Sequence, residues 1–66
     1  MKASVNGEPH ELPDGMTVAQ LLERLGAPRT GVAVAKNDRV VRRGAFDLEA
    51  LNDGDRIEII QAVAGG

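Results

Sequence analysis

The sequence predicts an α+β domain, in which a mixed sheet of about five short strands carries one main helix on one face. Three observations support this fold class. The 66 residues suffice for a single domain, 1–66, with a small core. Only one segment has both the apolar spacing and the end signals of a helix. Short apolar runs, separated by turn residues such as Asn-Gly and Asp-Gly, make up most of the rest.

The N-terminal segment predicts a β-hairpin. Residues 1–6 alternate between apolar and polar side chains, as in a half-buried strand. Asn6 and Gly7 favour a tight turn, because both central positions of such a turn take positive φ. The returning strand is expected at about residues 8–12. Pro9, which has no N–H group, places that strand at an edge of the sheet.

Residues 17–26 predict the helix. Thr17 and Gln20 match a capping box. Four apolar residues then follow at helical spacing, at positions 18, 21, 22 and 25. Gly26 is placed to end the helix in a left-handed conformation. A helix of this length is marginal on its own in water, so we expect its apolar stripe to dock on the sheet.

Two further strands are expected after the helix. The apolar run at residues 32–36 favours a strand covered on at least part of both faces. A turn at 37–38 leads into a short return strand at 39–41. Residues 45–51 predict one irregular or 3₁₀ turn whose apolar side chains fill the core, namely Phe46, Leu48 and Leu51.

The last strand is expected from Arg56 to about Val63, after a turn around Gly54. If the first and last strands pair in parallel at the centre of the sheet, the last strand leaves from its middle. That arrangement is the β-grasp, or ubiquitin-like, fold.

Composition excludes several function classes. There is no cysteine, and His10 is the only histidine, which excludes thiolate chemistry and a histidine metal cluster. The net charge of −2 argues against a nucleic-acid partner. No apolar run is long enough to cross a bilayer, and residues 1–7 lack the long apolar stretch of a secretion leader, so we expect none. We therefore expect a soluble, cytoplasmic protein, monomeric when free, with no bound cofactor, no metal and no membrane partner.

The C-terminal residues are the candidate functional site. Gly65 and Gly66 carry no side chains, so this backbone can enter a channel too narrow for other residues. Together with Ala64 they form the segment that we expect to enter partner active sites, with the carboxylate of Gly66 as the reactive group. Ile60, Ala62 and Val63 predict an apolar docking surface beside it. A β-bulge or a second core face is the alternative interpretation of Ile60.

Charged residues elsewhere have simpler interpretations. Arg39, Arg42 and Arg43 form a basic cluster that either steers an acidic partner or is a solvated face. Asp53 and Asp55 are interpreted as turn residues and not as a catalytic pair. Lys36 is expected to be an ordinary exposed lysine.

The sequence resembles the ThiS family of sulfur carriers in thiamine biosynthesis. The resemblance rests mainly on residues 32–37, on the Asp-Gly-Asp turn and strand within 51–59, and on the Gly-Gly end within 62–66. It extends over nearly the whole chain. Two positions depart from the family: it commonly has Pro at Arg42 and often Trp at Phe46. Both lie near the irregular turn and away from the terminus.

The resemblance implies a function. An E1-like adenylating enzyme would use ATP to convert the carboxylate of Gly66 into an acyl-adenylate. A persulfide donor would then supply the sulfur of a C-terminal thiocarboxylate, which passes to thiazole synthase. The chain has no nucleotide-binding Gly-rich motif of its own, so we expect a protein substrate and not an enzyme.

Three alternatives stay open at this point. The chain could be a small subunit of molybdopterin synthase or another ubiquitin-like sulfur carrier. It could be a protein tag joined to lysines through Gly66. The segment 12–18 is also similar to the TGS-type β-grasp modules of RNA-associated enzymes, although the acidic balance counts against that interpretation.

Overall fold

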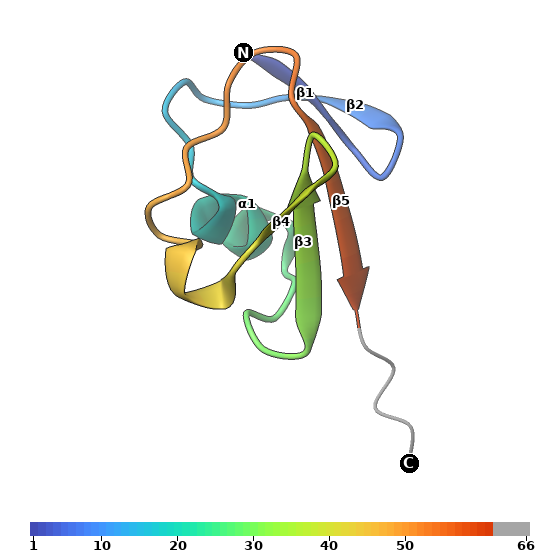
Figure 1. Ribbon diagram of the computed structural model, residues 1–66. Helices are drawn as coiled ribbons and strands as arrows, with labels where there is room; N and C mark the ends of the chain where they lie inside the picture. The colour runs from blue at the N-terminus through green and yellow to red at the C-terminus, as the bar shows by residue number, and fades with distance from the viewer. Residues whose placement is uncertain (62–66) are drawn as a thin grey trace.

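The structure is a computed structural model that describes residues 1–61, and within this range five strands form one sheet in the order β2-β1-β5-β3-β4. The strands are β1 (Lys2–Val5), β2 (Glu8–Glu11), β3 (Val32–Lys36), β4 (Arg39–Val41) and β5 (Arg56–Gln61). The helix α1 (Val18–Leu25) lies against one face of this sheet, and a short 3₁₀ helix, η1 (Arg43–Ala45), follows β4 (Figure 1). The predicted α+β class and β-grasp arrangement are confirmed.

The N-terminal hairpin forms as predicted. β1 and β2 pair antiparallel from Lys2 opposite Glu11 to Val5 opposite Glu8. The turn residues Asn6 and Gly7 have φ values of 50° and 83°, as a tight hairpin turn requires. β2 is an edge strand, which is where a proline within a strand is tolerated.

Both ends of α1 carry the predicted caps. At the N-terminus, the Thr17 hydroxyl accepts the Gln20 backbone N–H at 3.2 Å, and the Gln20 side chain accepts the Thr17 N–H at 2.9 Å. At the C-terminus, Gly26 is left-handed with φ of 70°, and the Ala27 N–H bonds to the Leu22 carbonyl at 2.9 Å. These local bonds define where the short helix begins and ends.

The core lies between α1 and the sheet. Val18, Leu21 and Leu22 on the helix are fully buried, and they meet buried side chains from β1, β3, β4 and β5. Phe46 and Leu51 close the core beside them, from the long connection between β4 and β5. Burial of this apolar surface is the main stabilising term in a domain of this size.

The irregular segment after β4 differs from the prediction in two ways. The 3₁₀ turn begins at Arg43 and not at Ala45. Leu48 does not fill the core, because its side chain is exposed while Phe46 and Leu51 occupy the available space. Leu25, at the end of the predicted apolar stripe, is also partly exposed.

β3 is covered on one face and partly covered on the other, where Ala35 is half-buried, which agrees with the prediction of cover on at least part of both faces. Val34 is buried under α1, whereas Ala33 is exposed on the opposite face. Small alanine side chains alternate with larger residues in this strand, and of the two alanines only Ala33 is exposed to solvent.

Lys36 and Asp55 belong to a polar network that the sequence did not reveal. The Lys36 ammonium lies 2.7 Å from the Glu49 carboxylate and donates to the Ala50 carbonyl at 3.0 Å. Asp55 is buried and accepts hydrogen bonds from the Asn37 side chain and the Asn52 N–H. The network ties the connection before β5 to the β3–β4 turn.

The Lys36 network makes stability depend on alkaline pH. Hydrogen bonding to Glu49, the largest cause, raises the pKa of Lys36 above its ordinary value of 10.5. Because the pKa of Lys36 is higher in the folded than in the unfolded protein, the charged ammonium contributes its full stabilisation at pH values below 10.5. This contribution is lost as the pH rises through the folded-state pKa. We expect Lys36→Met to lower the free energy of unfolding by about 1 kcal/mol at neutral pH and to flatten the alkaline decline.

Urea unfolding at neutral and alkaline pH measures this effect. Lys2→Met is the matched control, because the exposed Lys2 lies 3.9 Å from Glu11, and such surface pairs contribute under about 0.5 kcal/mol. Equal stability of Lys36→Met and the unsubstituted protein at neutral pH would contradict the expectation.

Candidate functional site

β5 leads from the core toward the C-terminal end of the sequence. It lies between two neighbours, pairing in parallel with β1 and antiparallel with β3. On the α1 face of the strand Ile57 is buried and Ile59 half-buried, whereas Ile60 on the opposite face is 65% exposed. The strand therefore contributes to the core through Ile57 and presents Ile60 to solvent near its described end.

The expected reactive terminus lies outside the described residues. This applies to Ala64, Gly65 and Gly66, and also to Ala62 and Val63 of the predicted docking surface. Their roles stay predictions. The structure does show the strand that leads toward them, whose last described residue, Gln61, lies opposite Val32 of β3.

Ile60 is part of a larger apolar surface on the sheet face opposite α1. Ala33 lies directly opposite Ile60 in the β3–β5 register, and Ala35 lies opposite Val40 in the β3–β4 register. Directly opposed residues share a face. Val40 is 80% exposed. We call Ala33, Ala35, Val40 and Ile60 the open-face patch.

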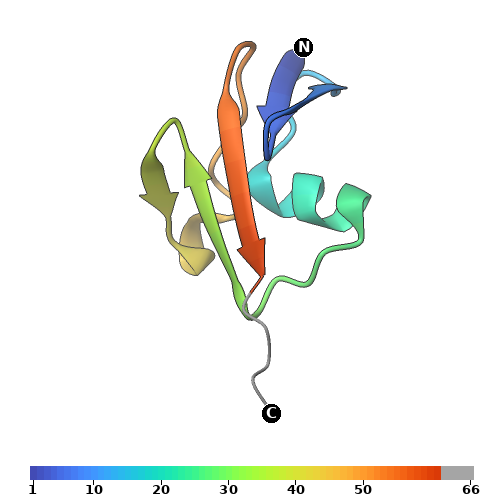
Figure 2. The ribbon, with the colours of Figure 1, turned by 90° about the vertical axis from the view of Figure 1, so that its right-hand side faces the viewer.

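No element covers the open-face patch among the described residues. Figure 2 looks onto this side of the sheet and shows β4, β3 and β5 next to one another, with no helix in front of them. The exposed position of Ile60 therefore excludes the alternative that it belongs to a second core face. The sequence did not lead us to expect Val40 in an exposed apolar surface. Its place next to an arginine in a short strand was a signal that could have indicated it.

Several charged residues lie on or near the strands that carry this patch. Glu58 lies on the same face, opposite Ala35, and Arg56 pairs with Asp38 at 2.8 Å. The three arginines of the basic cluster, Arg39, Arg42 and Arg43, are exposed along and after β4. The ion pairs found between residues 1 and 61 do not include them. Arg39 lies opposite Lys36 in the β3–β4 register and so belongs to the α1 face of the sheet, not to the face of the open-face patch. The role of the cluster in steering a partner stays a prediction.

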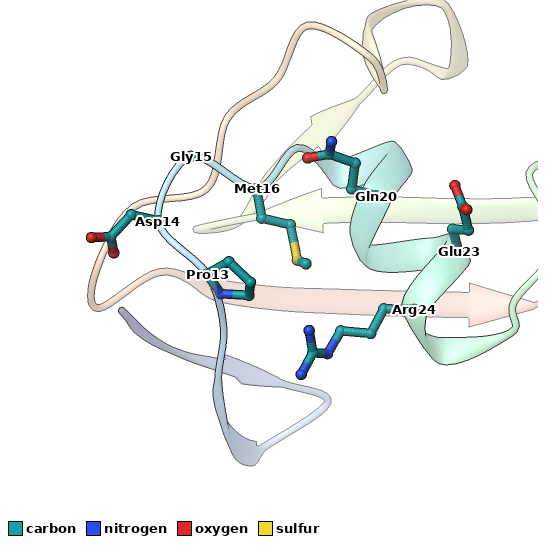
Figure 3. A pocket seen from close by; sticks show the side chains of 7 residues that line it. All are labelled: Pro13, Asp14, Gly15, Met16, Gln20, Glu23 and Arg24. Carbon is teal, nitrogen blue, oxygen red and sulfur yellow. The ribbon is translucent and has the colours of Figure 1, made fainter.

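A separate hollow of about 590 Å³ lies between α1 and the loop after β2. In Figure 3 the Arg24 side chain extends from α1 toward Pro13, whereas the Asp14 carboxylate points away. The loop residues of the hollow lie toward the start of β5, and the arrowhead of β5 points away from them. The loop side of the hollow is thus at the opposite end of β5 from its arrowhead.

The described residues offer neither a metal site nor a membrane-spanning helix. Residues 1–61 contain no group of three or more His, Cys, Asp or Glu side chains placed to hold a metal ion. No helix in this range is long and apolar enough to span a membrane. Asp53 and Asp55 act in the turn: Asp53 accepts the Lys2 N–H at 2.7 Å, and Asp55 accepts the Asn52 N–H at 2.7 Å.

Comparisons with known protein families, sequences and structures all point to the same family. A family model described as "ThiS family" matches residues 3–66. The sulfur carrier protein ThiS of Escherichia coli is 35% identical over 66 residues, which cover 100% of both chains. A crystal structure of a thiamine biosynthesis protein (ThiS) from Geobacter metallireducens superposes with a TM-score of 0.85 at 33% identity, again covering 100% of both chains.

Longer relatives also match. A thiazole synthase of Magnetococcus marinus is 41% identical to this chain over 66 residues, all of the chain but only 20% of the relative. The chain thus spans about a fifth of the length of the thiazole synthases it matches. In these relatives a segment similar to this chain is part of the same polypeptide as the rest of the synthase.

Proposed function

This chain belongs to the ThiS family, and we propose that it is a sulfur carrier of thiamine biosynthesis that bears sulfur on the carboxyl group of Gly66. The observation that carries the proposal is the path of β5. A strand paired on both sides leads from the core directly toward a terminal Gly-Gly sequence, beside an uncovered apolar face. The match to the E. coli carrier over the whole of both chains supports the same assignment.

The proposed chemistry takes place on the carboxylate of Gly66. A carboxylate is a poor electrophile, so an E1-like adenylating enzyme activates it with ATP, releasing pyrophosphate and forming an acyl-adenylate. A persulfide sulfur attacks the carbonyl carbon and displaces AMP. A second thiol then cleaves the S–S bond, forms a disulfide with the donor and leaves the thiocarboxylate on Gly66. The chain itself is a protein substrate with no catalytic residue, and it binds no cofactor.

Thiazole synthase is the proposed acceptor of the sulfur. The support is the pair of thiazole synthases that contain a segment similar to this chain. Two domains within one polypeptide meet at a high effective concentration. A sulfur carrier and the enzyme that accepts its sulfur would benefit from such a link. The free carrier is proposed to act as a monomer, and its cytoplasmic location stays a prediction.

The intact mass of the protein tests the proposed function. The chain is incubated with the adenylating enzyme of the same organism, ATP and a persulfide donor. Exchange of one oxygen for sulfur is the expected result. Isopeptide-linked products would instead indicate a protein tag. An unchanged mass with every adenylating enzyme tried would contradict the carrier function and favour a binding module.

We propose the open-face patch as the surface that docks on the adenylating enzyme. Replacing Ile60 or Val40 by Asp places a charge in this exposed apolar surface without disturbing the core. Each substitution is expected to raise the KM for activation about tenfold, as expected when an interface loses one apolar anchor. The thermal midpoint should change little, since both side chains are exposed.

Leu48→Asp is the matched control for the docking surface. Leu48 is as exposed as Val40 but lies on the connection after η1 and outside the open-face patch. Its KM should stay within about twofold of the unsubstituted value. A KM that rises equally in all three variants would show that the effect is one of general surface charge and would count against docking on this face.

A further inference from the structure

The Asn6 side chain continues the pairing of β1 with β5 beyond the point where β1 ends. The backbone bonds of this parallel pair run from the Ser4 N–H to the Asp55 carbonyl and from the Asn6 N–H to the Ile57 carbonyl, both at 2.9 Å. At the next step the backbone has turned away. There the Asn6 side-chain oxygen accepts the Ile59 N–H at 2.8 Å, and the side-chain amide donates to the Ile59 carbonyl at 3.2 Å.

Asparagine suits this position for two physical reasons. Its φ of 50° lies in the left-handed region, which Asn tolerates better than most other residues with a side chain. Its primary amide carries a donor and an acceptor on one carbon and can therefore bond both polar groups of a single residue. Aspartate would keep an acceptor but lose the donor to the Ile59 carbonyl, and glycine would lose both bonds.

The bond pair acts close to the described end of β5. On the β3 side, Ile60 and Gln61 are still paired with Ala33 and Val32. On the β1 side, Ile59 is the last β5 residue among those described that is bonded to the hairpin, and the Asn6 side chain makes both bonds. Asn6 therefore determines whether β5, just before Gln61, is hydrogen-bonded only to β3 or also to the N-terminal hairpin.

We infer that Asn6 is a positioning residue, which holds the end of β5 so that the carboxylate of Gly66 is presented to the adenylating enzyme in a reactive orientation. The inference rests on the proposed function. A group held in a near-attack position reacts much faster than one that samples many directions, and small misplacements lower the rate steeply. Docking through the open-face patch does not involve Asn6, so its loss should lower kcat and leave KM nearly unchanged.

A matched variant is available at the other end of the same strand. Asn37 also has a left-handed φ, of 52°, and its side chain also bonds the backbone of β5, accepting the Arg56 N–H at 2.9 Å. It bonds Asp55 as well, at 2.9 Å. Asn37→Gly thus removes comparable bonds from the start of β5, whereas Asn6→Gly removes them from the end that leads to Gly66.

The experiment measures steady-state activation of the unsubstituted protein, Asn6→Gly and Asn37→Gly by the adenylating enzyme with ATP and a persulfide donor, together with the stability of each. Asn6→Gly is expected to lower kcat about tenfold with KM within about twofold, while Asn37→Gly keeps both within about twofold. Asn6→Asp, which loses the donor alone, should lower kcat in the same direction, and it serves if Asn6→Gly does not fold.

Hydrogen exchange gives a readout without any partner. The Ile59 amide should exchange about tenfold faster in Asn6→Gly than in Asn37→Gly, because only the former loses its acceptor. Unchanged exchange at Ile59, an unchanged kcat in Asn6→Gly, or equal kcat losses in both variants would overturn the positioning role while leaving the carrier function intact. Failure of the unsubstituted protein to be activated would overturn both.

Discussion

A single alanine added after Gly66 is expected to abolish activation by the adenylating enzyme. The extra residue moves the terminal carboxylate by up to about 3.6 Å along the chain. Reacting atoms must approach to about 3–3.5 Å, so an added residue that carries the carboxylate past the reactive position beside the phosphate of ATP should cost at least about 100-fold. ATP–pyrophosphate exchange measures this step directly. The thermal midpoint should not change, because the addition lies outside the described core.

Gly65→Val tests the same terminus without lengthening it. A branched side chain at this position widens the backbone segment that must enter the partner, so activation should again be lost. Gly44→Val is the matched control, since a Cβ atom at Gly44 would meet nothing within 4 Å. Undiminished exchange with either the extended protein or Gly65→Val would contradict the proposed role of the terminus.

Phe46→Ala is expected to have the largest effect on stability. Phe46 is the only aromatic residue of the chain and is 1% exposed, in the core between α1 and the connection before β5. Removing a buried phenylalanine ring costs about 3–5 kcal/mol, which is much of the roughly 5–15 kcal/mol that stabilises an ordinary domain. The substituted protein should unfold at far lower urea concentration, as followed by circular dichroism.

Leu48→Ala is the control for Phe46→Ala. It also truncates a large apolar side chain of the same connection, but Leu48 is 82% exposed. Its free energy of unfolding should stay within about 0.5 kcal/mol of the unsubstituted value. If both substitutions destabilise the protein equally, the connection is packed differently from the structure described above.

The regular elements could be predicted because their signals are local. The Asn6-Gly7 turn, the Thr17–Gln20 capping box and the left-handed Gly26 all depend on neighbours within a few residues, and all three are confirmed. The central position of the last strand followed from the order of the elements together with the β-grasp pattern, and the pairing of β5 with β1 and β3 confirms it.

The irregular connection could not be predicted in the same way. No periodicity separates Phe46, Leu48 and Leu51, so all three were expected in the core. The space beside α1 takes only Phe46 and Leu51, and Leu48 faces solvent. Which of several apolar residues fills a limited space depends on the shapes of its tertiary neighbours, and sequence spacing carries no information about these.

In the candidate site, too, the locally encoded features could be predicted and those that depend on distant residues could not. The exposed apolar character of Ile60 was foreseen from its break in the alternation of β5, whereas its neighbours in the open-face patch come from the register of three strands. The bonds between Asn6 and Ile59 join residues 53 positions apart. A polar side chain whose partner is so distant is indistinguishable, in sequence, from an ordinary turn residue.

The most direct test of the central proposal is to locate the sulfur within the protein. After activation in the presence of ATP and a persulfide donor, the intact chain is fragmented in the mass spectrometer. We predict that the mass change of one oxygen for sulfur appears only in fragments that contain the carboxyl group of Gly66. Sulfur found on any other residue, or a Gly66 carboxylate that stays unmodified while thiazole synthase still receives sulfur from this chain, would contradict the account.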